Sequence, residues 1–136
     1  MVGRVVWVVD GDTIHVRIGS RLEKVRYIGV NAPEIPHPEE RGWREGGTQA
    51  QAVNLQLVGR ATAWLELDSR LRDTHGRLLA YVWVERSGAR VMANAEMIRR
   101  GFAQVMTIPP NVRYQALFLK LQREAREAGR GLWASE

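Results

Sequence analysis

The chain has 136 residues, which is enough for one domain with a hydrophobic core. No apolar run approaches the roughly 20 residues that a membrane-spanning helix needs, and no signal peptide is evident at the start of the chain. The absence of cysteine excludes disulfides, thiolate metal sites and a cysteine nucleophile. A formal net charge of +5, with eighteen arginines and two lysines, mildly favours a polyanionic partner such as nucleic acid.

The first thirty residues predict three strands joined by short turns. Residues 5–9 form a continuous apolar run and are predicted as a buried strand, whereas residues 13–18 alternate between apolar and polar side chains. Residues 22–30 are predicted as a third strand. The segment 10–13, with the sequence DGDT, has the composition of a tight turn. Closely spaced strands with short turns predict a β-meander.

Residues 31–47 are predicted as a long loop, because they contain three prolines and scattered charges. A loop of this length suggests a functional role. A helix is predicted over residues 48–58, with Ala52, Leu55 and Val58 on its inner face.

The second half of the chain predicts strands over residues 61–67 and 78–85, followed by helices over 94–100 and 113–130. Asn111 is predicted to cap the last helix. This order of strands and helices fits an α+β fold dominated by β structure, namely a five-stranded OB-fold barrel with about three helices. All 136 residues are predicted to form one domain.

Polar side chains gather at the predicted strand ends. They are Asp10, Asp12, Arg26, Asn31, Glu34, Asp73 and Arg77. If the sheet closes into a barrel, these strand ends share one rim, which would carry oxygen ligands beside two guanidinium groups. The bland alternatives are a solvated turn for the aspartates and simple surface ion pairs for the arginines.

Five motifs in order along the chain carry a family resemblance: VDGDT (9–13), VRYIGVNAPE (25–34), DTHGRLLAYV (73–82), NAEMIRRGFAQV (94–105) and AGRGLW (128–133). With these motifs the chain resembles the staphylococcal-type thermonuclease family over nearly its whole length. Members of this family are calcium-dependent nucleases with an OB barrel.

The resemblance implies one Ca²⁺ ion as cofactor. Asp12 matches a metal-binding aspartate, and Ala32 falls where the family offers a backbone carbonyl to the metal. Asn31 stands where most members have a second metal-binding aspartate. Its amide oxygen can still bind calcium, but the site loses one negative charge, which predicts weak binding and tolerance of other divalent ions.

The resemblance also implies catalytic roles for Arg26, Arg77 and Glu34. The two arginines match residues that hold and neutralise the scissile phosphate, and Glu34 matches the glutamate that orients or deprotonates the attacking water. This chemistry needs such residues because negative charge develops on the phosphate oxygens as water attacks.

Four further residues are candidates for secondary or substrate-contacting roles: Asp10, Asp73, His75 and Trp43. His75 could stack on a base or contact phosphate, and packing beneath the long loop is an equal alternative for Trp43. The other tryptophans, Trp7, Trp64, Trp83 and Trp133, are predicted to be core residues.

Two functions are compatible with these residues. The first is a calcium-dependent endonuclease that acts on single-stranded or frayed DNA and RNA and leaves 3′-phosphate ends. The second is a catalytically weak or inactive module that binds nucleic acid through the same barrel. Retention of the catalytic set favours the enzyme. A monomer is the default expectation, and family members are often exported, but the sequence itself does not indicate a location.

Overall fold

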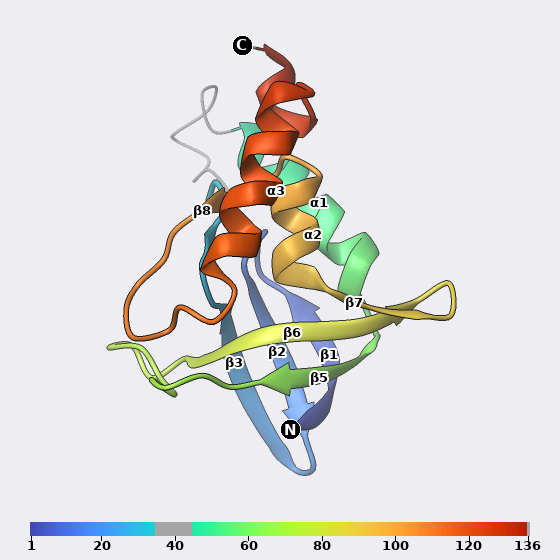
Figure 1. The fold of residues 1–136 in the computed structure, drawn as a ribbon. Helices are drawn as coiled ribbons and strands as arrows, with labels where there is room; N and C mark the ends of the chain where they lie inside the picture. The colour runs from blue at the N-terminus through green and yellow to red at the C-terminus, as the bar shows by residue number, and fades with distance from the viewer. Residues whose placement is uncertain (35–44, 136) are drawn as a thin grey trace.

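The computed structural model describes residues 1–34 and 45–135, and a closed β-barrel forms its lower half (Figure 1). The barrel strands are β1 (Val2–Val8), β2 (Thr13–Ile18), β3 (Arg21–Tyr27), β5 (Thr62–Glu66) and β6 (Leu78–Arg86). They are ordered β3-β2-β1-β5-β6 in antiparallel pairs, and a parallel pairing of β3 with β6 closes the barrel. The predicted five-stranded OB-type barrel is therefore confirmed.

Three shorter strands extend this framework. β7 (Ala89–Met92) forms a hairpin with β6, and β4 (Val30–Asn31) pairs with β8 (Gln104–Val105) in a separate two-stranded ladder. The third predicted strand, residues 22–30, is thus divided into β3 and β4. The division matters for the site, because it places Asn31 in a different ladder from Arg26.

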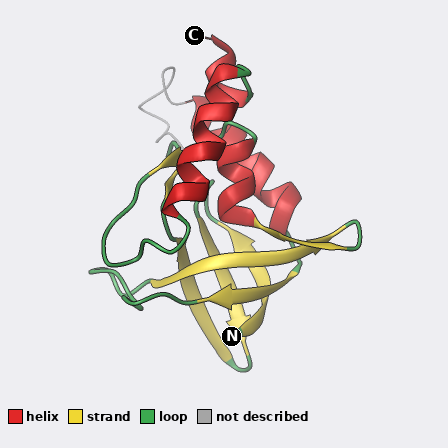
Figure 2. Ribbon diagram, viewed as in Figure 1, coloured by secondary structure: helices red, strands yellow, loops and turns green. Residues whose placement is uncertain are grey.

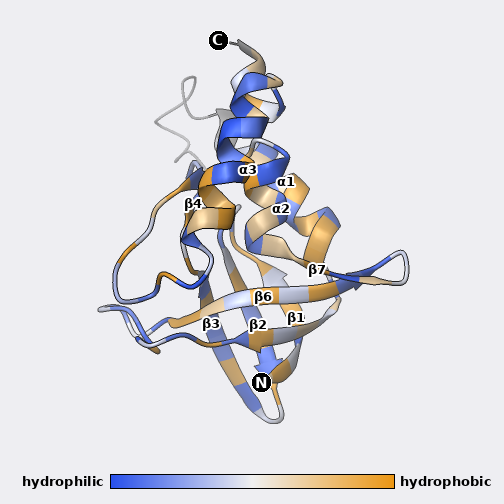
Figure 3. Ribbon diagram, viewed as in Figure 1, coloured by the Kyte–Doolittle hydropathy of each residue, from blue (hydrophilic) through white to orange (hydrophobic). Residues whose placement is uncertain are grey.

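The helices gather above one end of the barrel (Figure 2). They are α1 (Glu45–Val58), α2 (Ala93–Arg99), α3 (Gln115–Glu127) and a 3₁₀ helix, η1 (Gly131–Ser135). α3 is mostly hydrophilic (Figure 3) and buries Phe118 and Ala125. Among the described residues, no helix has the length and apolarity to cross a membrane.

The predicted inner face of α1 is partly wrong. Val58 is buried as expected, but Ala52 and Leu55 are exposed, and Ala50 and Leu57 face the core instead. The polar residue Asn54 is also fully buried on this inward face.

The prediction that residues 5–9 form a wholly buried strand is also wrong. Val5 and Val8 point into the barrel, but Val6 and Trp7 are 42% and 62% exposed. The pairing with β2 shifts register between Val5 and Trp7, as in a β-bulge, and this shift turns both side chains outward. Trp7 is therefore a surface residue, in contrast to the partly buried Trp83.

Asn111 does not cap the last helix. Its side-chain oxygen accepts a hydrogen bond from the Arg70 backbone N–H (2.8 Å), and its amide donates to the Arg70 carbonyl (2.9 Å). α3 begins at Gln115, with Tyr114 at the N-cap position. The side chain thus joins two loops instead of satisfying a helix end.

One buried asparagine links α2 to the barrel. Asn94 is fully buried, and its oxygen accepts a hydrogen bond from the Val82 N–H (2.8 Å). Its amide donates to the carbonyls of Ile28 (3.0 Å) and Ala80 (3.2 Å). A single side chain thereby pairs three backbone groups at the closure of β3 on β6. Of these, the Ala80 carbonyl also accepts a hydrogen bond from the Ile28 N–H (3.0 Å).

We expect Asn94→Ala to lower the free energy of unfolding by about 3 kcal/mol, because it leaves buried backbone groups without partners. Urea denaturation measures the change. Gln56→Ala, an exposed position on α1, serves as the control and should change stability by less than about 0.5 kcal/mol. A loss below about 1 kcal/mol for Asn94→Ala would contradict this role.

Candidate active site

The turn between β1 and β2 holds two aspartates in a fixed arrangement. The Asp10 carboxylate accepts a hydrogen bond from the Asp12 backbone N–H (2.9 Å), and the Val9 N–H donates to the Thr13 carbonyl (3.0 Å). Gly11 sits so close to the helical layer that an added Cβ would lie 2.8 Å from the Ala50 Cβ. The turn therefore needs a glycine for close packing.

Asp12 is the best-anchored carboxylate of this turn. It is 5% exposed, one of its oxygens accepts from the Thr13 hydroxyl (2.9 Å), and the other accepts from the Ala32 N–H (2.8 Å). The Arg26 guanidinium lies 3.5 Å from the same second oxygen. Asp12 thus connects the start of β2 to the segment that follows β4.

Asp10 and Asp12 create an excess of negative charge in this turn. Burial, together with the neighbouring Asp12 charge, raises the pKa of Asp10 to about 6. Two carboxylates at such a short spacing favour a nearby cation, because a positive charge would offset both burial and mutual repulsion.

Arg26 projects from β3 and is held by backbone carbonyls. Its Nη1 donates to the carbonyls of Tyr27 (2.9 Å) and Val30 (2.8 Å), and its Nη2 lies 3.5 Å from the Asn31 side-chain oxygen. These contacts fix the guanidinium between the Asp12 carboxylate and β4. The guanidinium therefore lies among oxygen atoms from the β1–β2 turn, the end of β3 and β4.

Arg77 is positioned by the turn that precedes β6. The Asp73 carboxylate accepts hydrogen bonds from the Arg77 Nε (2.7 Å) and from the backbone N–H groups of His75 and Arg77 (both 2.9 Å). Partial burial acts to raise the pKa of Asp73, but these hydrogen bonds hold it below the ordinary value. An ionised Asp73 thus orients Arg77 while leaving the guanidinium partly exposed.

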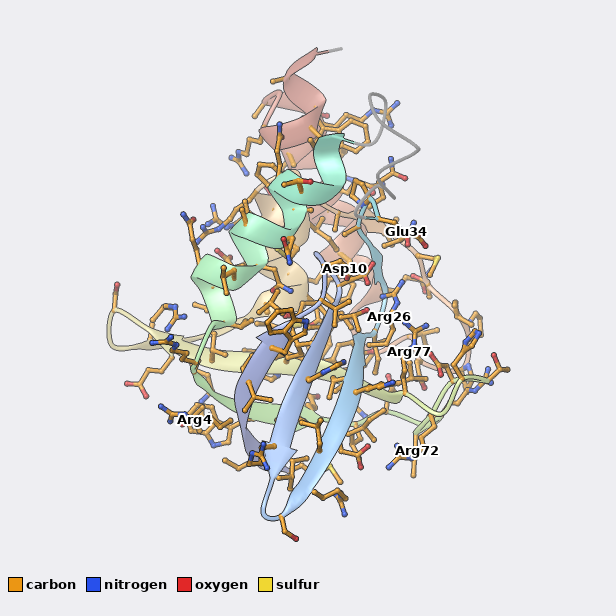
Figure 4. The ribbon with its side chains drawn as sticks, turned by 180° about the vertical axis from the view of Figure 1, so that it is seen from behind. Arg4, Asp10, Arg26, Glu34, Arg72 and Arg77 are labelled. Carbon is orange, nitrogen blue, oxygen red and sulfur yellow. The ribbon has the colours of Figure 1, made fainter. Side chains whose placement is uncertain are left out.

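Arg26 and Arg77 line the same cleft, which has a volume of about 250 Å³. Asp73 and His75 also line it, and Met106 is among its apolar lining residues. In Figure 4, Glu34, Arg26 and Arg77 follow one another along one edge of the molecule, with Asp10 beside them. The structure therefore brings together the two arginines that the sequence places 51 positions apart.

Among the candidates in the described part of the chain, Asp10, Asp12, Asn31, Ala32 and Glu34 are not lining residues of this cleft, and Asn31 lines a separate hollow with Pro33 and Phe102. Glu34 is an exposed residue that follows Ala32 by two positions, on the same edge as Arg26. Ala32 is buried, and its backbone N–H donates a hydrogen bond to the Asp12 carboxylate. Trp43 lies outside the described residues.

Sequence reasoning missed the polar support beneath the turn. Asn54, fully buried in α1, donates to the Asp10 carbonyl (2.9 Å) and accepts from the Tyr27 hydroxyl (2.6 Å). Gln51 donates to the Val8 carbonyl (3.2 Å). Burial raises the pKa of Tyr27 well above its ordinary value, so its hydroxyl remains a hydrogen-bond donor. The sequence signal that could have indicated this support is Asn54, a polar residue at helical spacing from the apolar residues Ala50, Leu57 and Val58.

The donor set fits a hard divalent cation bound by few protein ligands. Asp12 and Asn31 each have a side-chain oxygen 3.5 Å from the Arg26 Nη2, and Ala32 follows Asn31 in the sequence. Within residues 1–34 and 45–135, no group of three or more His, Cys, Asp or Glu could hold a metal ion. Calcium accepts mixed carboxylate, amide and carbonyl oxygens and completes its shell with water, so the donor set is chemically compatible with that ion.

Comparisons with known proteins found similar sequences over nearly the whole chain. Residues 24–135 match the family described as staphylococcal nuclease homologue. A thermonuclease of Staphylococcus intermedius is 32% identical over 93% of this chain and 72% of its own length. A prophage-derived endonuclease of Bacillus subtilis is 34% identical over 93% of this chain and 42% of its own length. An uncharacterized protein of Methanocaldococcus jannaschii is 31% identical over 96% of this chain and 70% of its own length.

The support beneath the turn predicts energetic coupling between Tyr27 and Asn54. We expect Tyr27→Phe and Asn54→Ala each to lower the free energy of unfolding by about 1–3 kcal/mol. The double variant should lose about 1 kcal/mol less than the sum, because the two side chains share one hydrogen bond. Chemical denaturation of the four proteins measures this difference.

Tyr114→Phe provides the matched control for this cycle, because the Tyr114 hydroxyl donates to Glu66 and not to Asn54. Its effect should add to that of Asn54→Ala within about 0.5 kcal/mol. Additivity of Tyr27→Phe with Asn54→Ala would show that their hydrogen bond does not support the turn.

Proposed function

Because the chain belongs to the staphylococcal nuclease homologue family, we propose that it is a Ca²⁺-dependent endonuclease. Its substrates are single-stranded or frayed DNA and RNA, and its products carry 3′-phosphate ends. The family, with relatives named as thermonuclease and endonuclease, supports a hydrolase of the nuclease class. The observation that carries the finer proposal is one cleft lined by Arg26 and Arg77, beside the Asp12 carboxylate.

The two guanidinium groups bind the scissile phosphate. Arg26 is already oriented by two backbone carbonyls, and Arg77 is oriented by Asp73. Donors fixed before the substrate arrives can stabilise charge on the phosphate oxygens without reorganising during the reaction. This arrangement favours the transition state, where that charge is greatest, over the ground state.

Asp12, Asn31 and the Ala32 carbonyl are the residues that would hold the calcium ion. When bound, a hard cation neutralises phosphate charge and activates water. Asp12 keeps its position through Thr13 and Ala32. With an amide at Asn31 the protein supplies less negative charge than two carboxylates would, so calcium affinity is low and other divalent ions can substitute.

Glu34 orients the attacking water and accepts its proton. The water oxygen forms a bond to phosphorus, the bond from phosphorus to the 5′ oxygen breaks, and that oxygen takes a proton from solvent as it leaves. The phosphate therefore remains on the 3′ side. The exposed position of Glu34, on the same edge as Arg26, is compatible with access to water at the phosphate.

A single strand suits this cleft better than a duplex. A volume of about 250 Å³ accommodates part of a nucleotide chain, and a flexible strand can present one phosphate to both arginines. His75 is exposed and lines the cleft, and in this proposal its side chain contacts a base or a neighbouring phosphate. Recognition of this kind depends little on base sequence.

The proposal predicts cleavage of labelled single-stranded DNA with calcium and none with a chelator. The new ends should resist extension by a polymerase until a phosphatase removes the 3′-phosphate. Binding without cleavage under every divalent ion tested would instead indicate a nucleic-acid-binding module. Extendable ends would contradict the proposed direction of cleavage.

We expect Arg77→Ala to lower kcat by a factor of about 10² to 10³, because it removes a fixed donor to the phosphate. Its effect on stability should not exceed about 1 kcal/mol, since the ion pair with Asp73 is partly exposed. Steady-state cleavage and thermal melting measure the two effects. Arg99→Ala removes a comparable ion pair with Glu96 on α2 and should leave kcat unchanged. Equal loss of activity in both variants would argue against a phosphate role for Arg77.

We expect Asn31→Asp to tighten calcium binding, because a carboxylate replaces an amide in the proposed ligand set. Isothermal titration calorimetry measures the affinity. Gln104→Glu, on the strand paired with β4, adds the same charge nearby and should give a much smaller gain. Equal gains from the two variants would mean that Asn31 is not a calcium ligand.

A further inference from the structure

Strands β1, β2 and β3 present a continuous outward surface, which faces the viewer in Figure 4. Trp7 pairs with His15, which pairs with Lys24, and Arg4 pairs with Arg17 in the neighbouring row. Directly paired residues of antiparallel strands share one face of the sheet. We call these five residues the β1–β3 outer face.

The charge of this surface has one sign. Across β1, β2 and β3, all of which the structure describes, Glu23 is the sole carboxylate, and it is 7% exposed. Glu23 is also paired with Arg72 (2.8 Å). The exposed cations Arg4, Arg17 and Lys24 therefore face solvent with no carboxylate among the outward positions of these strands. Such a surface attracts a polyanion.

Trp7 supplies an aromatic platform among these cations. Its side chain is 62% exposed, and the register shift in β1 brings Val6 to the surface beside it in sequence. A large aromatic side chain turned outward gains little for folding, because it stays in water. Aromatic rings exposed beside basic groups are the combination on which bases of a single strand stack.

The β1–β3 outer face is continuous with the cleft through β3. Lys24 and Arg26 are two residues apart on this strand, so both side chains lie on the same side of the sheet, about 7 Å apart along it. Arg26 also lines the cleft. A nucleic-acid strand that leaves the cleft past Arg26 would therefore next meet Lys24, and then His15 and Trp7 in the same row.

We propose that the β1–β3 outer face is a second binding surface, on which the nucleotides adjoining the cleft are held by stacking on Trp7 and by contacts from Lys24, Arg17 and Arg4 to phosphates. This inference rests on the proposed function, because it assumes that a nucleic-acid strand occupies the cleft. It adds the course that this nucleic acid takes outside the cleft. A second copy of the chain is a poor occupant, because the two faces would oppose their like charges.

Binding of labelled oligothymidylates in the presence of a chelator tests this surface, since the chelator prevents cleavage by the proposed metal-dependent reaction. The wild-type chain should bind a 16-mer more tightly than a 4-mer. Trp7→Ala should weaken 16-mer binding by about tenfold, whereas Trp7→Phe should retain most of the affinity. Fluorescence anisotropy measures both. Thermal melting checks that each variant is folded.

The chain has two lysines, which allow a variant and a matched control for the contribution of positive charge to nucleic-acid binding. Lys24→Gln should reduce the slope of log affinity against log salt by about 0.7 for a single strand, because one phosphate contact is lost. Lys120→Gln makes the same charge change on the exposed side of α3 and should leave the slope unchanged. Equal slopes for the two variants would overturn the proposal.

Failure of this inference and failure of the nuclease proposal give different results. If the wild-type chain cleaves DNA while Trp7→Ala and Lys24→Gln bind the 16-mer as it does, the outer face is overturned and the nuclease stands. If the wild-type chain cleaves nothing while both variants lose affinity, the outer face stands. A change in sedimentation with Trp7→Ala, and none in binding, would identify a self-association surface and overturn the proposal.

Discussion

The buried Asp12 carboxylate is the constraint on which the rest of the site depends. A nearly inaccessible charge is costly unless hydrogen bonds and an opposite charge compensate it. Thr13, the Ala32 backbone and Arg26 supply that compensation. Because these partners come from the start of β2, the residue that follows β4 and the end of β3, the three segments are held at one point. The pairing of Thr13 with Arg26 between β2 and β3 brings the start of β2 next to the end of β3.

The same constraint accounts for the polar layer under the turn. Beside Asp12, the Asp10 backbone carbonyl accepts a hydrogen bond from Asn54, and the Asp10 carboxylate accepts one from the Asp12 N–H. Asn54 in turn depends on the Tyr27 hydroxyl. A chain of hydrogen bonds therefore runs from β3 through α1 to the turn. Such a chain restricts where the two carboxylates can point, which is the requirement for a site that binds a cation beside a phosphate.

Much of the barrel could be predicted from the sequence, because the alternation over residues 13–18 places the buried Ile14 and Val16 on one face of a strand. The inward face of α1 could not, because Asn54 takes a core position through hydrogen bonds that a hydropathy pattern does not encode. Trp7 was misplaced for a different reason. A register shift in β1 changes which side chains face outward, and it leaves no mark on a continuous apolar run.

The candidate site was predictable where motifs specify residue types, as for Asp12, Arg26 and Arg77. The orientation of Arg26 by backbone carbonyls could not be predicted, since it depends on where the chain turns after β3.

The most direct test of this site is a crystal structure with calcium and a short single-stranded oligonucleotide that contains one non-hydrolysable linkage. We expect that linkage to lie between the Arg26 and Arg77 guanidinium groups, with calcium on Asp12 and Asn31. A strand bound elsewhere, with Arg77 contacting only Asp73, would contradict this expectation.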